Sequence, residues 1–254
     1  MTDELVGVQH HDDGIRIVTL DSPANRNALS SRLLDELARA LHDATRDPEV
    51  RAIVLTATGT VFSSGADFSE AGTSAPNLMP DVLTSVAESP VPVIARVNGH
   101  ARAGGLGLIA ACDMAAAPES ATFAFTEVRV GVAPAMILVP ALRVMDRRFL
   151  SQVTLTGERF GARQAAAAGL LSAVTEDEAA LDAWVDECTT SIRQSAPGAV
   201  RATKELVRKL PSRGWSDGLA EAAVVSAELF AGAEAAEGIN AFLQKRRPSW
   251  DTTE

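Results

Sequence analysis

Two segments of small residues each follow an apolar run that is typical of a buried strand. Residues 62–67 (Phe-Ser-Ser-Gly-Ala-Asp) follow the run 52–55, and residues 98–107, which hold four glycines, follow the run 91–97. Small side chains at the end of a strand let a ligand approach the backbone closely. Two backbone N–H groups that point at one spot form an oxyanion hole, which stabilises negative charge on a carbonyl oxygen. The pattern therefore favours chemistry at a carbonyl group.

The composition is that of a globular protein. The chain has 254 residues, of which 46% are hydrophobic and 22% charged, enough for one large domain or a domain with an appendage. No apolar run approaches the roughly 18 residues of a membrane span. The first residues also lack the basic and then apolar pattern of a secretory signal. We therefore expect a cytoplasmic protein with no membrane partner.

Charge and cysteine content narrow the partners further. A net charge of −10 argues against nucleic acid, because nucleic-acid binding depends on basic surface. Local basic residues can still bind a small anionic ligand. Cys112 and Cys188 are too few for a disulfide framework or a metal cluster, so we expect free thiols and no metal.

The elements that must position these segments alternate between strands and helices and then become helical only. Residues 6–8 and 15–18 flank an Asp-Gly hairpin signal, and Ser30 is the expected N-cap of a helix whose leucines share one face. The other expected elements are strands at 51–56, 91–97, 114–117 and 122–125, and helices at 82–87, 104–111, 163–168, 179–194, 198–210, 217–230 and 234–245. We predict an α/β core with a parallel-rich sheet over residues 1–195 and a helical region over 196–254.

The motifs together resemble the enoyl-CoA hydratase/isomerase (crotonase) superfamily. They are residues 25–30 (Asn-Arg-Asn-Ala-Leu-Ser), 62–67, 98–113, Glu127 with Gly131, 156–158 (Thr-Gly-Glu) and 165–170. The resemblance implies a spiral of ββα units with C-terminal helices that form a trimer, often paired into a hexamer. It also implies an acyl-CoA thioester substrate and no metal or redox cofactor, since coenzyme A is part of the substrate.

On the family pattern, the oxyanion hole is made by the backbone N–H groups of Ala66 and Gly104. Proton removal beside a thioester, and addition of water to an enoyl thioester, both pass through an enolate whose oxygen carries the developing charge. Each donor of such a hole is typically worth about 10²–10³ in rate. A carboxylate must then move protons within reach of the substrate's carbons.

The resemblance departs from the usual hydratase at this carboxylate. Hydratases of the superfamily commonly carry two catalytic glutamates, but the first position here is Gly107 and the second is Glu127. Glu127 follows two phenylalanines, and an apolar setting raises a carboxyl pKa and suits acid–base work; a surface glutamate is the alternative. One carboxylate suffices for a 1,3-proton shift or for hydration on one face. Some single-glutamate hydratases of branched acyl-CoAs resemble this pattern.

We therefore expect a 2-enoyl-CoA hydratase with Glu127 as its general acid and base, and a double-bond isomerase as the alternative. Gly107→Glu is expected to restore a two-carboxylate arrangement if space allows. The resemblance also suggests substrate-binding residues. Arg26 matches a position that contacts the CoA phosphates, and Phe242 and Lys245 match tail positions near the adenine in a neighbouring subunit's site. The remaining candidates that line the substrate route are Ala28, Ser64, Asp67, Phe68, Arg102 and Gly107.

Two other classes of protein remain open. Residues 105–110 satisfy G-x-G-x-x-A, a dinucleotide-binding pattern, although the six residues 98–103 lie between the preceding strand and the glycines that begin at Gly104. An acyl-CoA binder without activity is the other alternative. An absorbance change with crotonyl-CoA distinguishes an enzyme from a binder, and thermal protection by CoA but not NAD excludes a dehydrogenase.

The C-terminal helices predict self-association. Apolar residues recur on their faces at positions that one compact body does not obviously cover, and uncovered apolar surface usually marks an interface. These residues are Trp184, Val185, Ile192, Val224, Val225, Leu229 and Phe230. We expect a homotrimer or a dimer of trimers.

Overall fold

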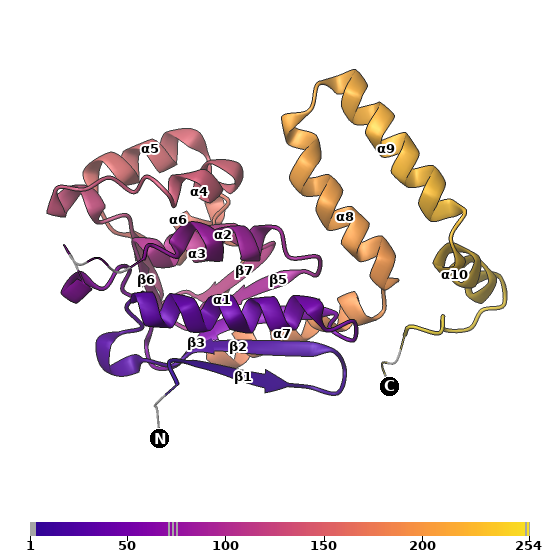
Figure 1. Ribbon diagram of the computed structural model, residues 1–254, viewed down its shortest axis with the longest axis horizontal. Coiled ribbons are helices and arrows are strands. Elements are labelled where there is room, and N and C mark those ends of the chain that lie inside the picture. The colour runs from indigo at the N-terminus through magenta and orange to yellow at the C-terminus, as the bar shows by residue number, and fades with distance from the viewer. Residues whose placement is uncertain (1–3, 71, 73, 75, 252, 254) are drawn as a thin grey trace.

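The strands of the protein divide between two sheets (Figure 1). A computed structural model describes residues 4–70, 72, 74, 76–251 and 253. The larger sheet has the order β1 (Val6–His10), β2 (Ile15–Leu20), β3 (Ala52–Ala57), β5 (Val93–Arg96), β7 (Met114–Pro118) and β10 (Ala173–Thr175). The smaller sheet has the order β4 (Val61–Ser63), β6 (His100–Arg102), β8 (Thr122–Ala124) and β9 (Phe160–Gly161). The predicted hairpin is the antiparallel pair β1–β2, and strands β2, β3, β5, β7 and β10 are parallel.

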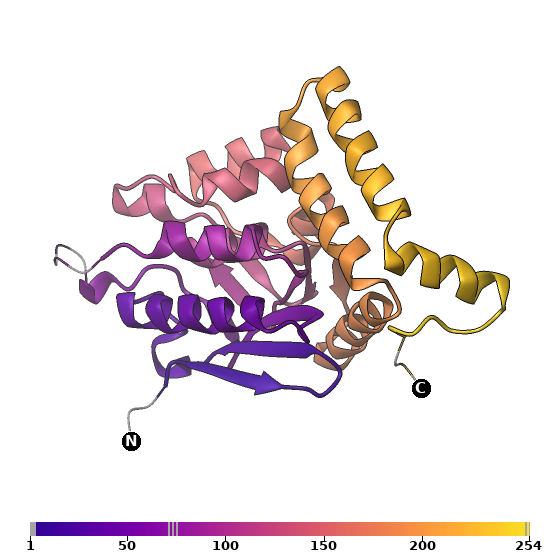
Figure 2. The same ribbon diagram turned by 45° about the vertical axis from the view of Figure 1, so that its right-hand side comes forward.

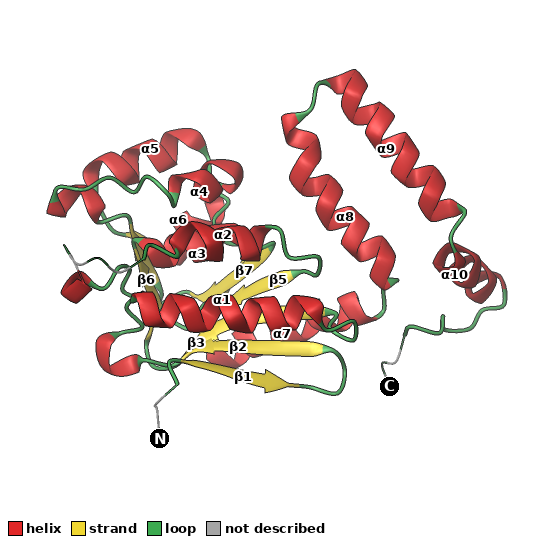
Figure 3. Cartoon of the chain, viewed as in Figure 1, coloured by secondary structure: helices red, strands yellow, loops and turns green. Residues whose placement is uncertain are grey.

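The chain passes repeatedly from the larger sheet to the smaller one. Strands β3, β5 and β7 are followed by β4, β6 and β8, and helices or helical turns then return the chain to the larger sheet. This arrangement is the spiral of ββα units that the resemblance to the crotonase superfamily implies. The helices that accompany the sheets are α1 (Ser31–Arg46), α2 (Met79–Ala87), α3 (Gly104–Ala111), α4 (Leu138–Val144), α5 (Arg147–Thr156), α6 (Ala162–Ala167) and α7 (Glu178–Arg193) (Figure 3).

Local signals explain where the first helix begins. The Ser30 hydroxyl accepts the N–H of Leu33 at 3.2 Å, which confirms the predicted cap. The leucines of α1 are buried against the sheet, as their shared face predicts. The 16-residue helix ends at Arg46, directly before Asp47-Pro48.

The opposite face of the larger sheet is covered by α7. Val185 and Ile192 of α7 pack with Ile15, Val54 and Ile94 in a second apolar core. The expectation that the apolar face of this helix is left for a partner is therefore wrong for α7. A sheet whose helices lie on one face only would expose its other face to water, and α7 removes that exposure.

The last three helices extend beyond the α/β core: α8 (Pro197–Lys209), α9 (Trp215–Phe230) and α10 (Ala233–Leu243). Figure 2 shows α8 and α9 as a hairpin, with α8 on the side of the α/β core and α9 on the outer side. The Lys204 ammonium fixes α8 to the core, because it lies 2.7 Å from Asp113 and donates to the Val91 carbonyl at 3.0 Å. In contrast, Phe230 on α9 is 74% exposed, which agrees with the uncovered apolar face predicted there.

Two other expectations concern the chain as a whole. Among the described residues, no helix has the length and apolar character needed to cross a membrane. The expectation that the first residues carry no secretory signal concerns a segment that includes residues 1–3, and these three residues lie outside the described part of the chain.

Candidate active site

Three neighbouring strands of the smaller sheet end at one place. Strands β4, β6 and β8 are parallel and adjacent, so their carboxyl ends share one edge. Ala66, Gly104 and Glu127 each follow one of these strands by two or three residues. Ligands of open α/β sheets characteristically bind at the carboxyl ends of parallel strands. The fold thus places the three predicted catalytic residues at one edge.

The segments that carry Ala66 and Gly104 touch each other. Gly65 has φ +90°, and a Cβ built on it would lie 2.7 Å from the Ala103 Cβ and 3.4 Å from the Gly104 nitrogen. A side chain at position 65 would therefore separate the two segments, and the positive φ also favours glycine. Ala66 follows Gly65, and Gly104 follows Ala103. The close approach of Gly65 and Ala103 therefore brings the segments that carry the N–H groups of Ala66 and Gly104 next to each other.

The N–H of Gly104 is available for a ligand. Gly104 is the first residue of α3, where an N–H has no acceptor within the helix and gains from the helix dipole. The preceding residue, Ala103, has φ 47° and ψ −119°, a conformation that costs a residue with a Cβ about 1–3 kcal/mol. Ala66 is exposed and Gly104 is partly exposed, so a substrate can reach both segments.

A buried hydrogen-bond network holds the Ala66 loop. Asn27 is fully buried, and its side-chain amide donates to the carbonyls of Thr58 and Val61 at 3.0 and 2.8 Å. The Ser63 hydroxyl donates to the Asn27 carbonyl at 2.9 Å and accepts the N–H of Gly65 at 3.1 Å. Asn27 and Ser63 thus hold the backbone of the loop that carries Ala66. Sequence reasoning missed both, because no local pattern distinguishes a buried Asn or Ser from one in a loop.

Glu127 begins the short 3₁₀ helix η3 (Glu127–Val130) and is half-buried. Its Oε2 atom is buried and has no hydrogen-bond partner among the described residues. Burial raises the pKa of this carboxyl above its usual value, and a hydrogen bond to its own backbone opposes the shift. An unpaired, desolvated carboxylate oxygen is costly for the fold, and such groups are characteristic of functional sites.

Gly107 lies one turn after Gly104 on α3 and is buried. A Cβ at position 107 would lie 2.8 Å from the Ile137 Cβ and still closer to its Cγ2. Gly107→Glu is expected to restore a second carboxylate only if space allows. The structure leaves no such space, because Ile137 fills the volume that the glutamate side chain would need. A role for Gly107 in substrate binding stays a prediction.

Arg26, Ala28 and Ser64 lie beside the Ala66 loop. The Ser64 N–H donates to the Arg26 carbonyl at 3.0 Å, and the Arg26 side chain is exposed. Ala28 is buried, at 7% exposure, next to Leu29, whose N–H donates to the Gly65 carbonyl at 2.8 Å. Arg26 is therefore accessible to a ligand, whereas Ala28 is buried and its contact with a substrate stays a prediction.

Asp67 and Phe68 directly follow Ala66. The Asp67 carboxylate accepts from the N–H and hydroxyl of Ser69 at 2.9 and 2.7 Å, so it shapes the turn into the 3₁₀ helix η2 (Phe68–Glu70). Phe68 is 67% exposed, so it is not part of the core and is accessible to a ligand.

Arg102 is half-buried on β6, and its guanidinium is engaged within the chain. It donates to the carbonyls of Ala101 and Thr122 and to the Thr122 hydroxyl. These bonds fasten β6 to the start of β8, and contact between Arg102 and a substrate stays a prediction.

Phe242 and Lys245 lie far from the edge formed by β4, β6 and β8. Phe242 is on α10, which stands on the opposite side of the molecule from β6 (Figure 1). Its side chain is 81% exposed, and Lys245 is exposed just beyond the helix. Neither residue can therefore reach the site of its own chain in this arrangement.

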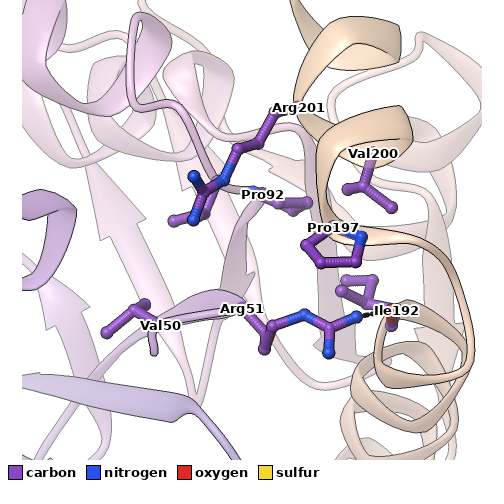
Figure 4. Close-up of a pocket in the computed structure, with 8 residues that line it drawn as sticks. Val50, Arg51, Pro92, Ile192, Pro197, Val200 and Arg201 are labelled. Carbon is purple, nitrogen blue, oxygen red and sulfur yellow. Dashed lines mark hydrogen bonds between the residues drawn. The ribbon is translucent and has the colours of Figure 1, made fainter. Parts of the chain in front are cut away.

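A small cavity of about 10 Å³ lies at the amino ends of β3 and β5, and its lining includes Arg51, Pro92, Ile192 and Arg201 (Figure 4). The Arg51 guanidinium donates there to the carbonyls of Ile192 and Ser195 at 3.1 and 2.6 Å. This cavity belongs to the joint between α7 and α8, and no predicted site residue lines it. In the described part of the chain, no group of three or more His, Cys, Asp or Glu residues could hold a metal ion.

The fold and this edge define an enzyme of the crotonase class. The sequence matches the enoyl-CoA hydratase/isomerase family over residues 10–253, and the chain belongs to that family.

Individual relatives agree with this assignment. A Thermus thermophilus protein provisionally described as an enoyl-CoA hydratase is 36% identical over 252 residues, covering 95% of this chain and 99% of that protein. The 2,3-dehydroadipyl-CoA hydratase of Escherichia coli is 31% identical over 242 residues, covering 93% and 94%. The solved enoyl-CoA hydratase of Mycobacterium smegmatis superposes with a TM-score of 0.92 at 32% identity, covering 98% and 99%.

Proposed function

We propose that the protein adds water to a 2-enoyl-CoA thioester, with Glu127 as the single general acid and base. The observation that carries this proposal is the unpaired, buried Oε2 of Glu127 at the sheet edge that also holds Ala66 and Gly104. The names of the relatives support hydration over other reactions of the family.

In this mechanism the thioester oxygen accepts the N–H groups of Ala66 and Gly104. The Glu127 carboxylate takes a proton from water while the water oxygen bonds to the β-carbon. The electron pair of the double bond moves toward the carbonyl, and the hole stabilises the enolate oxygen, at about 10²–10³ in rate per donor. Protonated Glu127 then returns the proton to the α-carbon, which restores the carboxylate.

The same carboxylate supports a second reaction, the 1,3-proton shift of a double-bond isomerase. The observation that favours it is Ile137, which leaves no room for a second carboxylate beside Gly107. A proton shift between the α- and γ-carbons needs one base and no held water, so isomerisation is the alternative to hydration. Neither reaction calls for a cofactor other than the coenzyme A of the substrate.

We also propose that the protein assembles in multiples of three. The exposed apolar side chains of α9 and α10 support self-association, among them Val224 at 59% and Phe242 at 81%, and the number three follows from the resemblance to the family. Burial of such surface is a main driving force for association. In the assembly, Phe242 and Lys245 contribute to the CoA site of a neighbouring subunit. The cytoplasmic location stays a prediction.

The test is a panel of 2-enoyl and 3-enoyl CoA thioesters followed by mass spectrometry. A mass gain of one water is expected for 2-enoyl substrates. An unchanged mass with a shifted double bond would replace hydration by isomerisation, and no turnover of any thioester would overturn the proposal. Light scattering that gives a monomer at micromolar concentration would contradict the assembly.

A further inference from the structure

The wall beside the hole is apolar and tightly packed. Gly104 and Gly107 are one turn apart and therefore share a face of α3. The Met79 Cε would lie 3.6 Å from a Cβ at Gly104 and 3.4 Å from one at Gly107. The Leu29 Cδ1 would lie 2.8 Å from the Cβ at Gly104. Met79 and Ile137, at 5% and 4% exposure, thus form a continuous surface along this face.

Ile137 closes the space that a missing side chain would otherwise leave open. A glycine on a helix face normally leaves a hollow of about one methyl group or more, which a branch on a ligand can enter. Here the Ile137 side chain lies against the Gly107 backbone. Isoleucine is branched at Cβ and has few rotamers, and Ile137 immediately precedes α4, so this part of the wall is stiff.

We propose that Ile137 restricts the acyl group to chains without a branch at the reacting carbons. This proposal rests on the proposed function, because it takes the thioester oxygen to be bound at the Gly104 N–H. The α- and β-carbons are then one and two bonds beyond the carbonyl carbon, within reach of the turn of α3 that carries Gly107. A methyl branch on either carbon meets Ile137 where no space is left.

The substrate class that follows is a straight-chain 2-enoyl thioester. The resemblance of the Gly107 pattern to hydratases of branched acyl-CoAs suggests the opposite preference. Packing decides between the two, because the volume released by the absent glutamate is occupied by Ile137 and is not open to a branch.

The experiment compares straight and branched ligands in binding and in turnover. Calorimetry with butyryl-CoA, isobutyryl-CoA and isovaleryl-CoA measures Kd without any reaction. Mass spectrometry with crotonyl-CoA, tiglyl-CoA and 3-methylcrotonyl-CoA measures kcat/KM for hydration. One methyl group against a packed wall is worth about 10–200-fold, and we expect this preference for the straight chain in both measurements.

Substitution of the wall identifies the residue responsible. Ile137→Ala is expected to reduce the straight-to-branched ratio at least about tenfold, and Ile137→Val to reduce it less. Branched enoyl groups are intrinsically less reactive than straight ones. This difference is the same for both proteins, so it cancels when the straight-to-branched ratio of the variant is divided by that of the wild type. Ile94→Ala is the matched control, because Ile94 is also buried, at 0% exposure against 4% for Ile137, but belongs to the apolar core under α7. The control is expected to lower stability and to leave the ratio unchanged.

The outcomes separate this proposal from the proposed function. If wild type binds branched and straight acyl-CoAs equally, or if Ile137→Ala leaves the ratio as it was, the role of Ile137 is overturned. If no thioester is hydrated but the Kd ratio changes with Ile137, the wall is supported and the proposed reaction fails. Should Ile137→Ala not fold, the wild-type Kd ratio and Ile137→Val still decide.

Discussion

The loops that carry Ala66 and Gly104, the proposed oxyanion hole, and the C-terminal helices are built in opposite ways. Around the hole, Asn27 and Ser63 are fully buried and their hydrogen bonds fix the backbone of the Ala66 loop. On α9 and α10, Phe230 and Phe242 are 74% and 81% exposed. One region satisfies its polar groups within the chain, whereas the other leaves its apolar groups uncovered.

This difference separates two tasks. Preorganised donors stabilise charge well only if they do not have to reorient during the reaction, so the hole needs a rigid, self-contained support. An interface gains its free energy from surface that becomes buried only on association. We therefore expect substitutions at the proposed hole to lower turnover without affecting assembly. Substitutions on α9 are expected to disrupt assembly and to act on turnover only through the loss of the neighbouring subunit.

Among substitutions near the proposed hole, Glu127→Gln is expected to have the largest effect on turnover. The amide keeps the size of the side chain but cannot accept a proton, so turnover is expected to fall by about 10²–10⁴ with little change in acyl-CoA affinity. Glu119→Gln is the control, because Glu119 is exposed and paired with Arg163. Near-normal turnover of Glu127→Gln on the best substrate would mean that another group carries the proton.

Loss of one donor has the next largest effect. Ala66→Pro removes the backbone N–H and is expected to lower turnover by about 10²–10³, with CoA still bound. Ala66→Gly keeps the N–H and is expected to remain active. Gly104→Val is expected to act similarly, because a Cβ there meets Leu29. A folded Ala66→Pro protein with wild-type turnover would contradict the position of the hole.

Charged substitutions on α9 test whether its exposed apolar side chains form an interface between subunits. Val224→Glu combined with Phe230→Glu places two carboxylates on the exposed apolar face, and desolvating them opposes association. The mass by light scattering is expected to fall to that of the monomer, and KM to rise about tenfold, the effect of losing about 1.4 kcal/mol of substrate binding from a neighbour's residues. His42→Glu instead adds an exposed carboxylate to α1, outside the C-terminal helices, and should leave the mass unaltered.

The pH dependence links activity to the buried carboxylate. The pKa of Glu127 is raised by burial above 4.5, and hydration needs the ionised form, so kcat/KM should rise with pH through this raised pKa and then level off. For stability, a raised folded-state pKa favours the fold at low pH, and this contribution is lost as pH increases through that pKa. Glu127→Gln should therefore unfold at a higher temperature than wild type near pH 7 but not at pH 4. The same stability difference at both pH values would exclude a desolvated carboxylate.

The smallest expected effect comes from the strained residue before Gly104. Ala103→Gly relieves a conformation with φ 47°, but glycine also loses more backbone entropy on folding. The net gain is about 1 kcal/mol, or about 2–4 °C in Tm for a chain of this size. Thermal unfolding measures it, and a fall in Tm would show that the surrounding loops demand the alanine.

Prediction from the sequence succeeded where a signal lies within a few residues. The buried helix predicted at 104–111 is α3 as observed, and the five helices predicted after residue 160 differ from α6–α10 by two residues or fewer at each end. Of the smaller sheet only β8 was predicted, as the strand at 122–125; β4, β6 and β9 were not. Its strands have two or three residues, too few for an alternating pattern to be distinguished from a loop.

The sequence by itself determined the family, the helical C-terminal region, and the identities of Ala66, Gly104 and Glu127 as candidates, because these depend on motif order and on local periodicity. Tertiary structure alone decided that β4, β6 and β8 bring those residues to one edge, that α7 is covered by its own sheet while α9 is not, and that Ile137 fills the space beside Gly107. These features depend on contacts between residues that are distant in the chain. Gly107 and Ile137 are thirty positions apart, and only close packing puts the side chain of one against the backbone of the other.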